Sequence, residues 1–178
     1  MGAMYNKLKS ATPHAAKAYY KTPPLVGEVG RGPSFYYMTI QELQQEVIEE
    51  FQDFEDWMDK YQLLIDLGTE QEPLAEQYKT PQNLIDGCQS RVWLQADYKE
   101  DGNIYFQAES DALIVKGIVA LLIRVLSGHS PQEILDADMS FLDEIGLKDH
   151  LSPTRSNGLL AMVKQMKAYA LAFSTIAN

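Results

Sequence analysis

Residues 92–108 read VWLQADYKEDGNIYFQA, in which two runs of alternating apolar and polar side chains flank a polar stretch at 100–103. An alternation with a period of two is typical of a strand with one buried face. Asp101, Gly102 and Asn103 are residue types that favour a tight turn. The stretch therefore predicts an antiparallel β-hairpin with strands at 92–98 and 104–108.

Residues 111–127 follow the hairpin and are apolar at nearly every position around a helical circumference. A helix of this kind is expected at the centre of a hydrophobic core. Gly117 lies in its interior, where glycine costs about 1 kcal/mol relative to alanine. This glycine indicates that a neighbouring element approaches the helix closely.

Helical patterns also precede the hairpin. From residue 40 to 65, apolar side chains recur every three or four positions, which predicts one amphipathic helix. Thr39 and Glu42 have the spacing of a capping box at its start, and Gly68 is the expected stop. Thr80 followed by Pro81 is typical of a cap before a short turn that ends near residue 87.

Three helices are expected after the central one. Residues 130–133 read SPQE, a capping box with proline at the first helical position. A short helix is expected around 141–145, and the last helix should run from Pro153 or Gly158 to Ile176. Together these patterns predict an α+β fold in which a small antiparallel β-sheet packs against several helices.

Residues 1–37 differ in composition from the rest of the chain. They are rich in Gly, Pro and small residues, and they hold five cationic side chains against one acid. We expect a disordered or extraneous leader at 1–37, with Met38 as the natural start, and a single domain at 38–178. A transit peptide is the weaker alternative, because the leader is basic but contains one arginine.

The overall charge and the cysteine count exclude several classes. The formal net charge is −10, which argues against nucleic acid and anionic membrane as partners. No stretch is apolar enough for a membrane span, and no secretory signal is visible. The single cysteine cannot form an internal disulfide or a multi-cysteine zinc site. A reducing compartment, the cytoplasm, is therefore the expected location.

The usual catalytic motifs are missing. The chain has no G-x-G-x-x-G after a strand, no phosphate loop and no G-x-S-x-G elbow. The three histidines are far apart in the sequence. His129 and His150 fall in predicted loops, and both are expected to be surface or capping residues.

Cys88 is the remaining candidate for chemistry. Composition alone favours a small buried hydrophobe. Its setting favours reactivity, because Gly87, Gln89 and Ser90 place it at a turn that leads into the first strand. Gly87 permits a positive φ, and an ionised thiol at such a turn is a nucleophile. Since no nearby residue is an obvious general base, exchange chemistry is favoured over hydrolysis.

Four segments carry a family resemblance. These are TPQNLI at 80–85, GCQSRVW at 87–93, SDA with IVKG at 110–117, and LSPTRSNGL at 151–159. Their order and spacing resemble those of the SufE family, which includes the CsdE proteins. The match extends over about Met38 to Ala177.

The resemblance implies a function and a partner. SufE-type proteins accept persulfide sulfur from a PLP-dependent cysteine desulfurase, stimulate that enzyme and relay sulfur to downstream iron–sulfur scaffold proteins. Their fold is similar to that of the IscU type, and they are often homodimers. The acceptor cysteine matches Cys88. The chain is then a sulfur carrier and activator rather than an enzyme, and it needs no cofactor because the pyridoxal phosphate belongs to the partner.

The matched segments supply six further residues with expected roles in supporting the cysteine loop or contacting the partner. Asp111 has the competing role of an acid at a helix start, and structural pairing is the favoured interpretation for Lys116. Leu84, Ile85 and Val92 are expected to shield the sulfur, which partner binding would then expose. The six residues are Gly87, Gln89, Ser90, Asp111, Lys116 and Arg155.

Three other interpretations remain open. One is an IscU-like scaffold or adaptor, although a cluster usually needs several thiolates. A second is a single-cysteine thiol peroxidase, which would need an exposed cysteine with a low pKa. The third is a structural protein with an inert buried cysteine.

Overall fold

The computed structural model describes residues 38–176, so the predicted leader at 1–37 lies outside the described residues. The elements run in the order α3 (Ile40–Gln52), α4 (Trp57–Glu70), η1 (Glu76–Tyr78), η2 (Pro81–Asn83), β1 (Val92–Tyr98), β2 (Ile104–Ser110), α5 (Leu113–Leu126), α6 (Pro131–Asp136), α7 (Phe141–Glu144), α8 (Leu147–His150) and α9 (Pro153–Ile176). The predicted α+β fold is confirmed, with helices packed against one antiparallel hairpin.

The hairpin has the predicted strands, with the second two residues longer than expected. β1 and β2 pair in antiparallel register from Val92 opposite Ser110 to Tyr98 opposite Ile104. Buried and less buried side chains alternate along both strands, as the period of two requires. Gly102 has a φ of 81° at the turn, a value that glycine adopts without strain.

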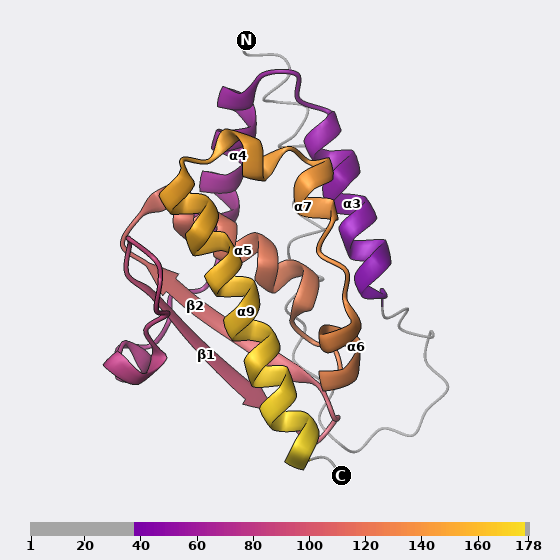
Figure 1. The fold of residues 1–178 in the computed structure, drawn as a ribbon, viewed down its shortest axis with the longest axis vertical. Helices are drawn as coiled ribbons and strands as arrows, with labels where there is room; N and C mark the ends of the chain where they lie inside the picture. The colour runs from indigo at the N-terminus through magenta and orange to yellow at the C-terminus, as the bar shows by residue number, and fades with distance from the viewer. Residues whose placement is uncertain (1–37, 177–178) are drawn as a thin grey trace. The chain divides into compact units, whose positions relative to one another are not determined.

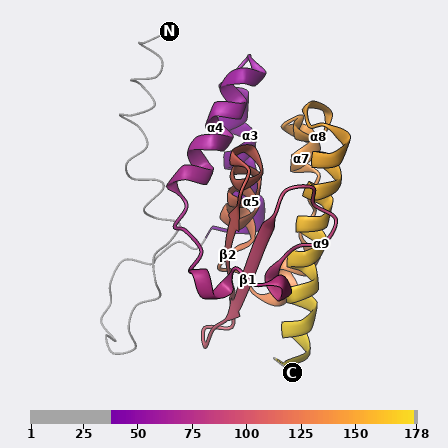
Figure 2. The ribbon, with the colours of Figure 1, turned by 90° about the vertical axis from the view of Figure 1, so that its left-hand side faces the viewer.

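α5 lies at the centre of the core, as its apolar circumference predicts. Ten of its fourteen residues are buried, and it contacts α3, α4, α9 and β2. A fully buried Leu or Ile side chain stabilises the fold by about 1.5–3 kcal/mol. In Figure 2, α4 lies to one side of α5, and α9 lies to the other.

The close contact expected at Gly117 is made with α4. A Cβ added to Gly117 would lie 2.0 Å from the backbone oxygen of Leu64. A Cβ added to Gly68 would lie 2.7 Å from the backbone nitrogen of Gly117. The two helix backbones therefore touch where each carries a glycine.

Two details of the predicted first helix are wrong. The pattern from residue 40 to 65 belongs to two helices, because α3 ends at Gln52 and Asp56 caps α4 through a hydrogen bond from the Met58 amide. Gly68 does not stop a helix but lies inside α4. It is needed there for the contact with α5, so tertiary packing overrides its usual role as a terminator.

The capping boxes at the starts of α3 and α6 are confirmed. In each, a hydroxyl accepts from the backbone of the third helical residue, whose glutamate accepts from the cap backbone. The expected cap at Thr80 is wrong in detail, because η2 starts there without a side-chain cap. A single 3-10 turn leaves fewer amide groups for such a cap to satisfy.

α9 runs along the hairpin and closes the fold from the C-terminal side. Figure 1 shows this helix in yellow, following the direction of the two strands. It also packs on α6, where the Lys167 amine donates to the carbonyl oxygens of Leu135 and Ala137 at 3.1 and 2.7 Å. Within residues 38–176, no helix has the length and apolar content that crossing a membrane requires.

His129 is not at the surface, contrary to the expectation from its loop position. Its side chain is buried, and Nε2 lies 3.0 Å from the backbone oxygen of Met38. Its backbone oxygen accepts from the amide of Ile104, which ties the loop after α5 to β2. The short sequence pattern around His129 gives no signal of these distant partners. His150 is exposed, as expected.

Candidate functional site

Residues 84–91 form the Cys88 loop, which connects η2 to β1. The two ends of the loop are joined by a hydrogen bond of 2.8 Å from the Ile85 amide to the Val92 oxygen. Next to it, Leu84 and Trp93 pair in an isolated antiparallel β-bridge. Gly87 has a φ of 88°, the left-handed conformation that its place before the cysteine predicts. The loop therefore turns sharply just before the sulfur.

The thiol of Cys88 faces the start of α9. Its Sγ lies 3.6 Å from the carbonyl oxygen of Gly158, to which the S–H donates. Gly87 lies against the same helix, since a Cβ on it would be 3.7 Å from the Cβ of Ala161. Cys88 itself is half-buried and packs on the edge of the hydrophobic core. One turn of α9 thus forms a seat for the sulfur.

Burial raises the pKa of the Cys88 thiol. Desolvation disfavours the thiolate, and the carbonyl oxygen of Gly158 accepts a hydrogen bond that only the S–H form can donate. The free protein therefore holds Cys88 mainly as the neutral thiol at neutral pH. The side chain is thus partly shielded, and its hydrogen-bond partner belongs to α9.

The far end of the loop is pinned to the chain just before α5. Arg91 donates to the Asp111 carboxylate twice, from Nε at 2.9 Å and from its backbone amide at 3.1 Å. The hydrogen bond from the Arg91 side chain is the main reason that the pKa of Asp111 is lowered. Asp111 therefore acts through Arg91, while Ala112 stands at the cap position of α5 without a side-chain bond.

Arg91 was missed by the sequence reasoning, although it lies within the GCQSRVW stretch. Its guanidinium also lies 5.5 Å from the centre of the Trp93 ring. An arginine beside a strand carries no signal of its own. Its importance follows from an acid that lies 20 residues later in the chain.

Within residues 38–176, none of the other expected site residues makes a hydrogen bond with the Cys88 sulfur. Lys116 pairs with Glu109 at 2.7 Å, the structural role that was favoured for it. Arg155 is exposed in the first turn of α9 and makes no ion pair with any residue from 38 to 176. The side chains of Gln89 and Ser90 form no hydrogen bonds within the same described part. Arg155 and Gln89 are exposed, so they are available to a partner.

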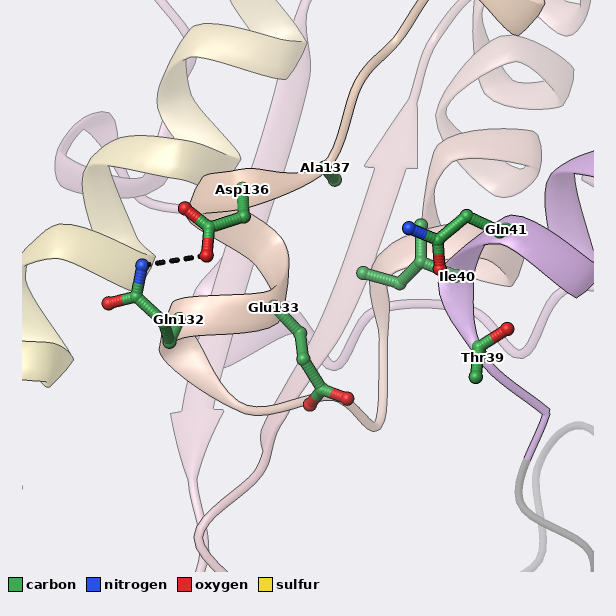
Figure 3. Close-up of a pocket in the computed structure, with 7 residues that line it drawn as sticks. All are labelled: Thr39, Ile40, Gln41, Gln132, Glu133, Asp136 and Ala137. Atoms are coloured by element: carbon green, nitrogen blue, oxygen red, sulfur yellow. Dashed lines mark hydrogen bonds between the residues drawn. The ribbon is translucent and has the colours of Figure 1, made fainter.

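A separate pocket of about 200 Å³ lies between the start of α3 and α6 (Figure 3). Its lining comprises Thr39, Ile40, Gln41, Gln132, Glu133, Asp136 and Ala137. Glu133 is engaged in the α6 capping box, and Asp136 accepts from Gln132 at 2.9 Å. The lining includes no part of the Cys88 loop. Among the described residues, no group of three or more His, Cys, Asp or Glu is placed to hold a metal ion.

Comparison with known proteins identifies the family. A family model described as "SufE: Fe-S metabolism associated domain" matches residues 45–170. The chain is also 41% identical over 127 residues to "SufE-like protein 1, chloroplastic/mitochondrial" from Arabidopsis thaliana. The alignment covers 71% of this chain and 34% of the plant protein, so the chain spans about a third of that relative's length. The chain belongs to the SufE family.

The fold agrees with a solved structure. The solution structure of a hypothetical protein from Thermus thermophilus matches with a TM-score of 0.63 at 22% identity. The match covers 75% of this chain and 96% of the other chain. At this level of identity the likeness shows that the two proteins share a fold.

Proposed function

We propose that Cys88 accepts persulfide sulfur from a PLP-dependent cysteine desulfurase and relays it for iron–sulfur cluster assembly. The observation that carries the proposal is the placement of Cys88. The one cysteine of a SufE-family chain lies on a turn, half-buried against α9. A thiol that is reachable by loop movement but sheltered at rest suits a carrier of a labile sulfur atom.

The transfer is a thiol exchange at sulfur. The Cys88 thiolate attacks the outer sulfur of the enzyme's Cys–S–SH, and a new S–S bond forms to that sulfur. The S–S bond within the enzyme breaks, and the enzyme's cysteine leaves as a thiolate. Cys88 becomes Cys–S–SH. No electron donor or acceptor is needed, because one sulfur atom simply changes its thiol partner.

Partner binding would open the loop. In the free protein, burial raises the pKa of Cys88 and the Gly158 carbonyl accepts its S–H. Both effects oppose formation of the attacking thiolate. Movement of the loop away from α9 removes both. The Arg91–Asp111 contacts are exposed, so a partner can reach and replace them.

The remaining site residues are assigned roles by position. Gly87 sets the turn before the sulfur, and exposed side chains are offered by Gln89 in the loop and by Arg155 in the first turn of α9. Ser90 lies between the sulfur and the pinned Arg91. Lys116 supports the hairpin through Glu109 and is placed outside the transfer step. On this proposal the protein is a sulfur carrier and activator without a cofactor of its own, and downstream scaffold proteins receive the sulfur.

Three wider assignments accompany the proposal. Residues 38–178 form the sulfur-acceptor domain, and residues 1–37 are a separate leader. We also propose that the protein forms a homodimer, as the family resemblance implies, which light scattering would test. It works in a reducing compartment, the cytoplasm, and cell fractionation decides between this site and an organelle of the kind in the plant relative's name.

The test is an intact mass after incubation with the host's cysteine desulfurase and free cysteine. We expect Cys88 to gain about one sulfur atom, and the desulfurase to turn over faster. Cys88→Ser should abolish both effects. No adduct and no stimulation would overturn the proposal. Sulfenic acid formed with catalytic turnover of peroxide would show a thiol peroxidase instead.

A further inference from the structure

Gly158 is the residue of α9 that lies against Cys88. A Cβ built on Gly158 would lie 3.4 Å from Sγ and 3.9 Å from both Cα and Cβ of Cys88. These three atoms are its nearest neighbours outside its own stretch of helix. Gly158 is buried, whereas Cys88 is half-buried. The missing side chain thus leaves space on the sheltered side of the sulfur.

A persulfide needs more room than a thiol. An S–S bond is about 2.05 Å long, so the outer sulfur reaches well beyond the position of Sγ. If it points outward, it lies in solvent and is open to nucleophiles and oxidants. If it points inward, it passes over the backbone of Gly158. A methyl group there, 3.4 Å from Sγ, would occupy the space that the second sulfur requires.

Resting on the proposed sulfur transfer, we infer that Gly158 is a positioning residue that seats the outer sulfur of the Cys88 persulfide. Gly158 leaves a gap beside Sγ, and a residue with a side chain would fill that gap. Among the residues from 38 to 176, Gln89, Ser90 and Arg155 make no hydrogen bond with the sulfur. Storage of the sulfur therefore depends on Gly158, whereas acceptance of the sulfur depends on the loop and the partner.

The carbonyl of Gly158 also suits the loaded state. In the free thiol, Sγ–H donates to this oxygen at 3.6 Å. After transfer Sγ carries no hydrogen, and the outer S–H is the available donor. An oxygen acceptor favours S–H over S⁻, so it holds the persulfide in its protonated, less nucleophilic form. The seat would thus slow attack by the persulfide as well as attack upon it.

The choice of glycine at this position supports a role beyond the helix. Glycine is a poorer helix former than alanine, and Gly158 lies inside a helix of 24 residues. An alanine methyl would make an ordinary contact with the thiol form of Cys88, because its nearest distance is 3.4 Å. Alanine at position 158 is therefore compatible with Cys88 as a thiol. It should disturb Cys88 as a persulfide.

The experiment compares the lifetime of the persulfide in wild type, Gly158→Ala and Lys164→Ala. Lys164 is exposed further along α9 and serves as the matched control. Each protein is loaded with sodium polysulfide or with the desulfurase and cysteine, and is then exposed to cyanide. Cyanide takes the outer sulfur as thiocyanate and leaves Cys88 as a thiolate, which intact mass follows with time. We expect roughly tenfold faster loss in Gly158→Ala, and unchanged loss in Lys164→Ala.

The outcomes separate the two proposals. If wild type is loaded by polysulfide but never by the desulfurase, the proposed function fails while the seat can still be measured. If Gly158→Ala loses its persulfide no faster than wild type, the inference about Gly158 is overturned and the proposed function stands. Thermal unfolding of both variants checks that the fold is intact. A Gly158→Ser protein adds a larger group and should shorten the lifetime further.

Discussion

Gly117 and Gly158 are both helix glycines that let another segment come close, yet they differ in what they touch. At Gly117 the neighbour is backbone, and a Cβ would lie 2.0 Å from the oxygen of Leu64. At Gly158 the neighbour is the Cys88 side chain, with Sγ at 3.4 Å from the same kind of position. The first contact has no slack, whereas the second has room for a thiol. Glycine therefore serves helix packing in the core at Gly117, whereas at Gly158 it leaves room beside the Cys88 side chain.

Of the substitutions that test this comparison, Gly117→Ala is expected to have the largest effect on stability. The new methyl group overlaps the backbone of α4, so α4 and α5 must move apart at the centre of the core. We expect the free energy of unfolding to fall by at least about 3 kcal/mol, at the upper end of overpacking effects. Urea unfolding followed by circular dichroism measures the change.

Gly158→Ala is the matched control for this stability measurement. Its methyl group meets a side chain at contact distance, and alanine favours a helix by up to about 1 kcal/mol over glycine. The free energy of unfolding should therefore stay level or rise. Equal losses of stability in the two variants would contradict the distinction between a tight and a slack contact.

A second prediction concerns the ionisation of Cys88 in its seat. Because burial raises the pKa of the thiol, the thiolate fraction at neutral pH is below that of an exposed cysteine. The rate of alkylation by iodoacetamide should rise with pH, with a midpoint above the ordinary value of about 8.5. At pH near 7.5 the folded protein should react roughly fivefold more slowly than the urea-unfolded chain. Equal rates would show that the seat does not protect the sulfur.

The smallest effect is expected from Asp111→Asn, which weakens the contact that pins the loop through Arg91. The pair is largely exposed, so its influence is modest and is screened by salt. We expect roughly twofold faster alkylation of Cys88 at low salt, and a smaller difference at high salt. Asp143→Asn removes another exposed pair, with Lys148, and should leave the rate unchanged. A response to both substitutions would indicate a general charge effect.

The hairpin and the central helix could be predicted because their signals are local. Alternation along residues 92–98 and the apolar circumference of α5 each lie within one continuous stretch. The meaning of Gly68 could not be read in this way, since a glycine near the end of a helical pattern looks like a stop. Its partner, Gly117, is in another helix. The prediction of an exposed His129 was wrong for the same reason, because its ring contacts the backbone of Met38, which is distant in the sequence.

In the candidate site, too, the residues with local signals were predicted and those with distant partners were not. Cys88 and Gly87 were found from neighbouring residues, and the left-handed turn at Gly87 agrees with that prediction. Arg91 was not found, because its acid lies 20 residues further on, and Gly158 lies 70 residues from the sulfur it faces. Contacts over such separations depend on how the last helix packs. Local sequence patterns do not encode that packing.

The position of α9 has a consequence for the synthesis of the protein. The ribosome makes Cys88 about 70 residues before Gly158, the residue that faces its sulfur. At about 5–20 residues per second, the nascent thiol waits several seconds or more before its cover exists. Until α9 is made, the contact between Gly158 and Cys88 that the folded chain shows is absent, so we expect the thiol to be more open to oxidants. Newly made chains are therefore more vulnerable to oxidative loss of the acceptor than finished ones, whatever the stability of the mature fold.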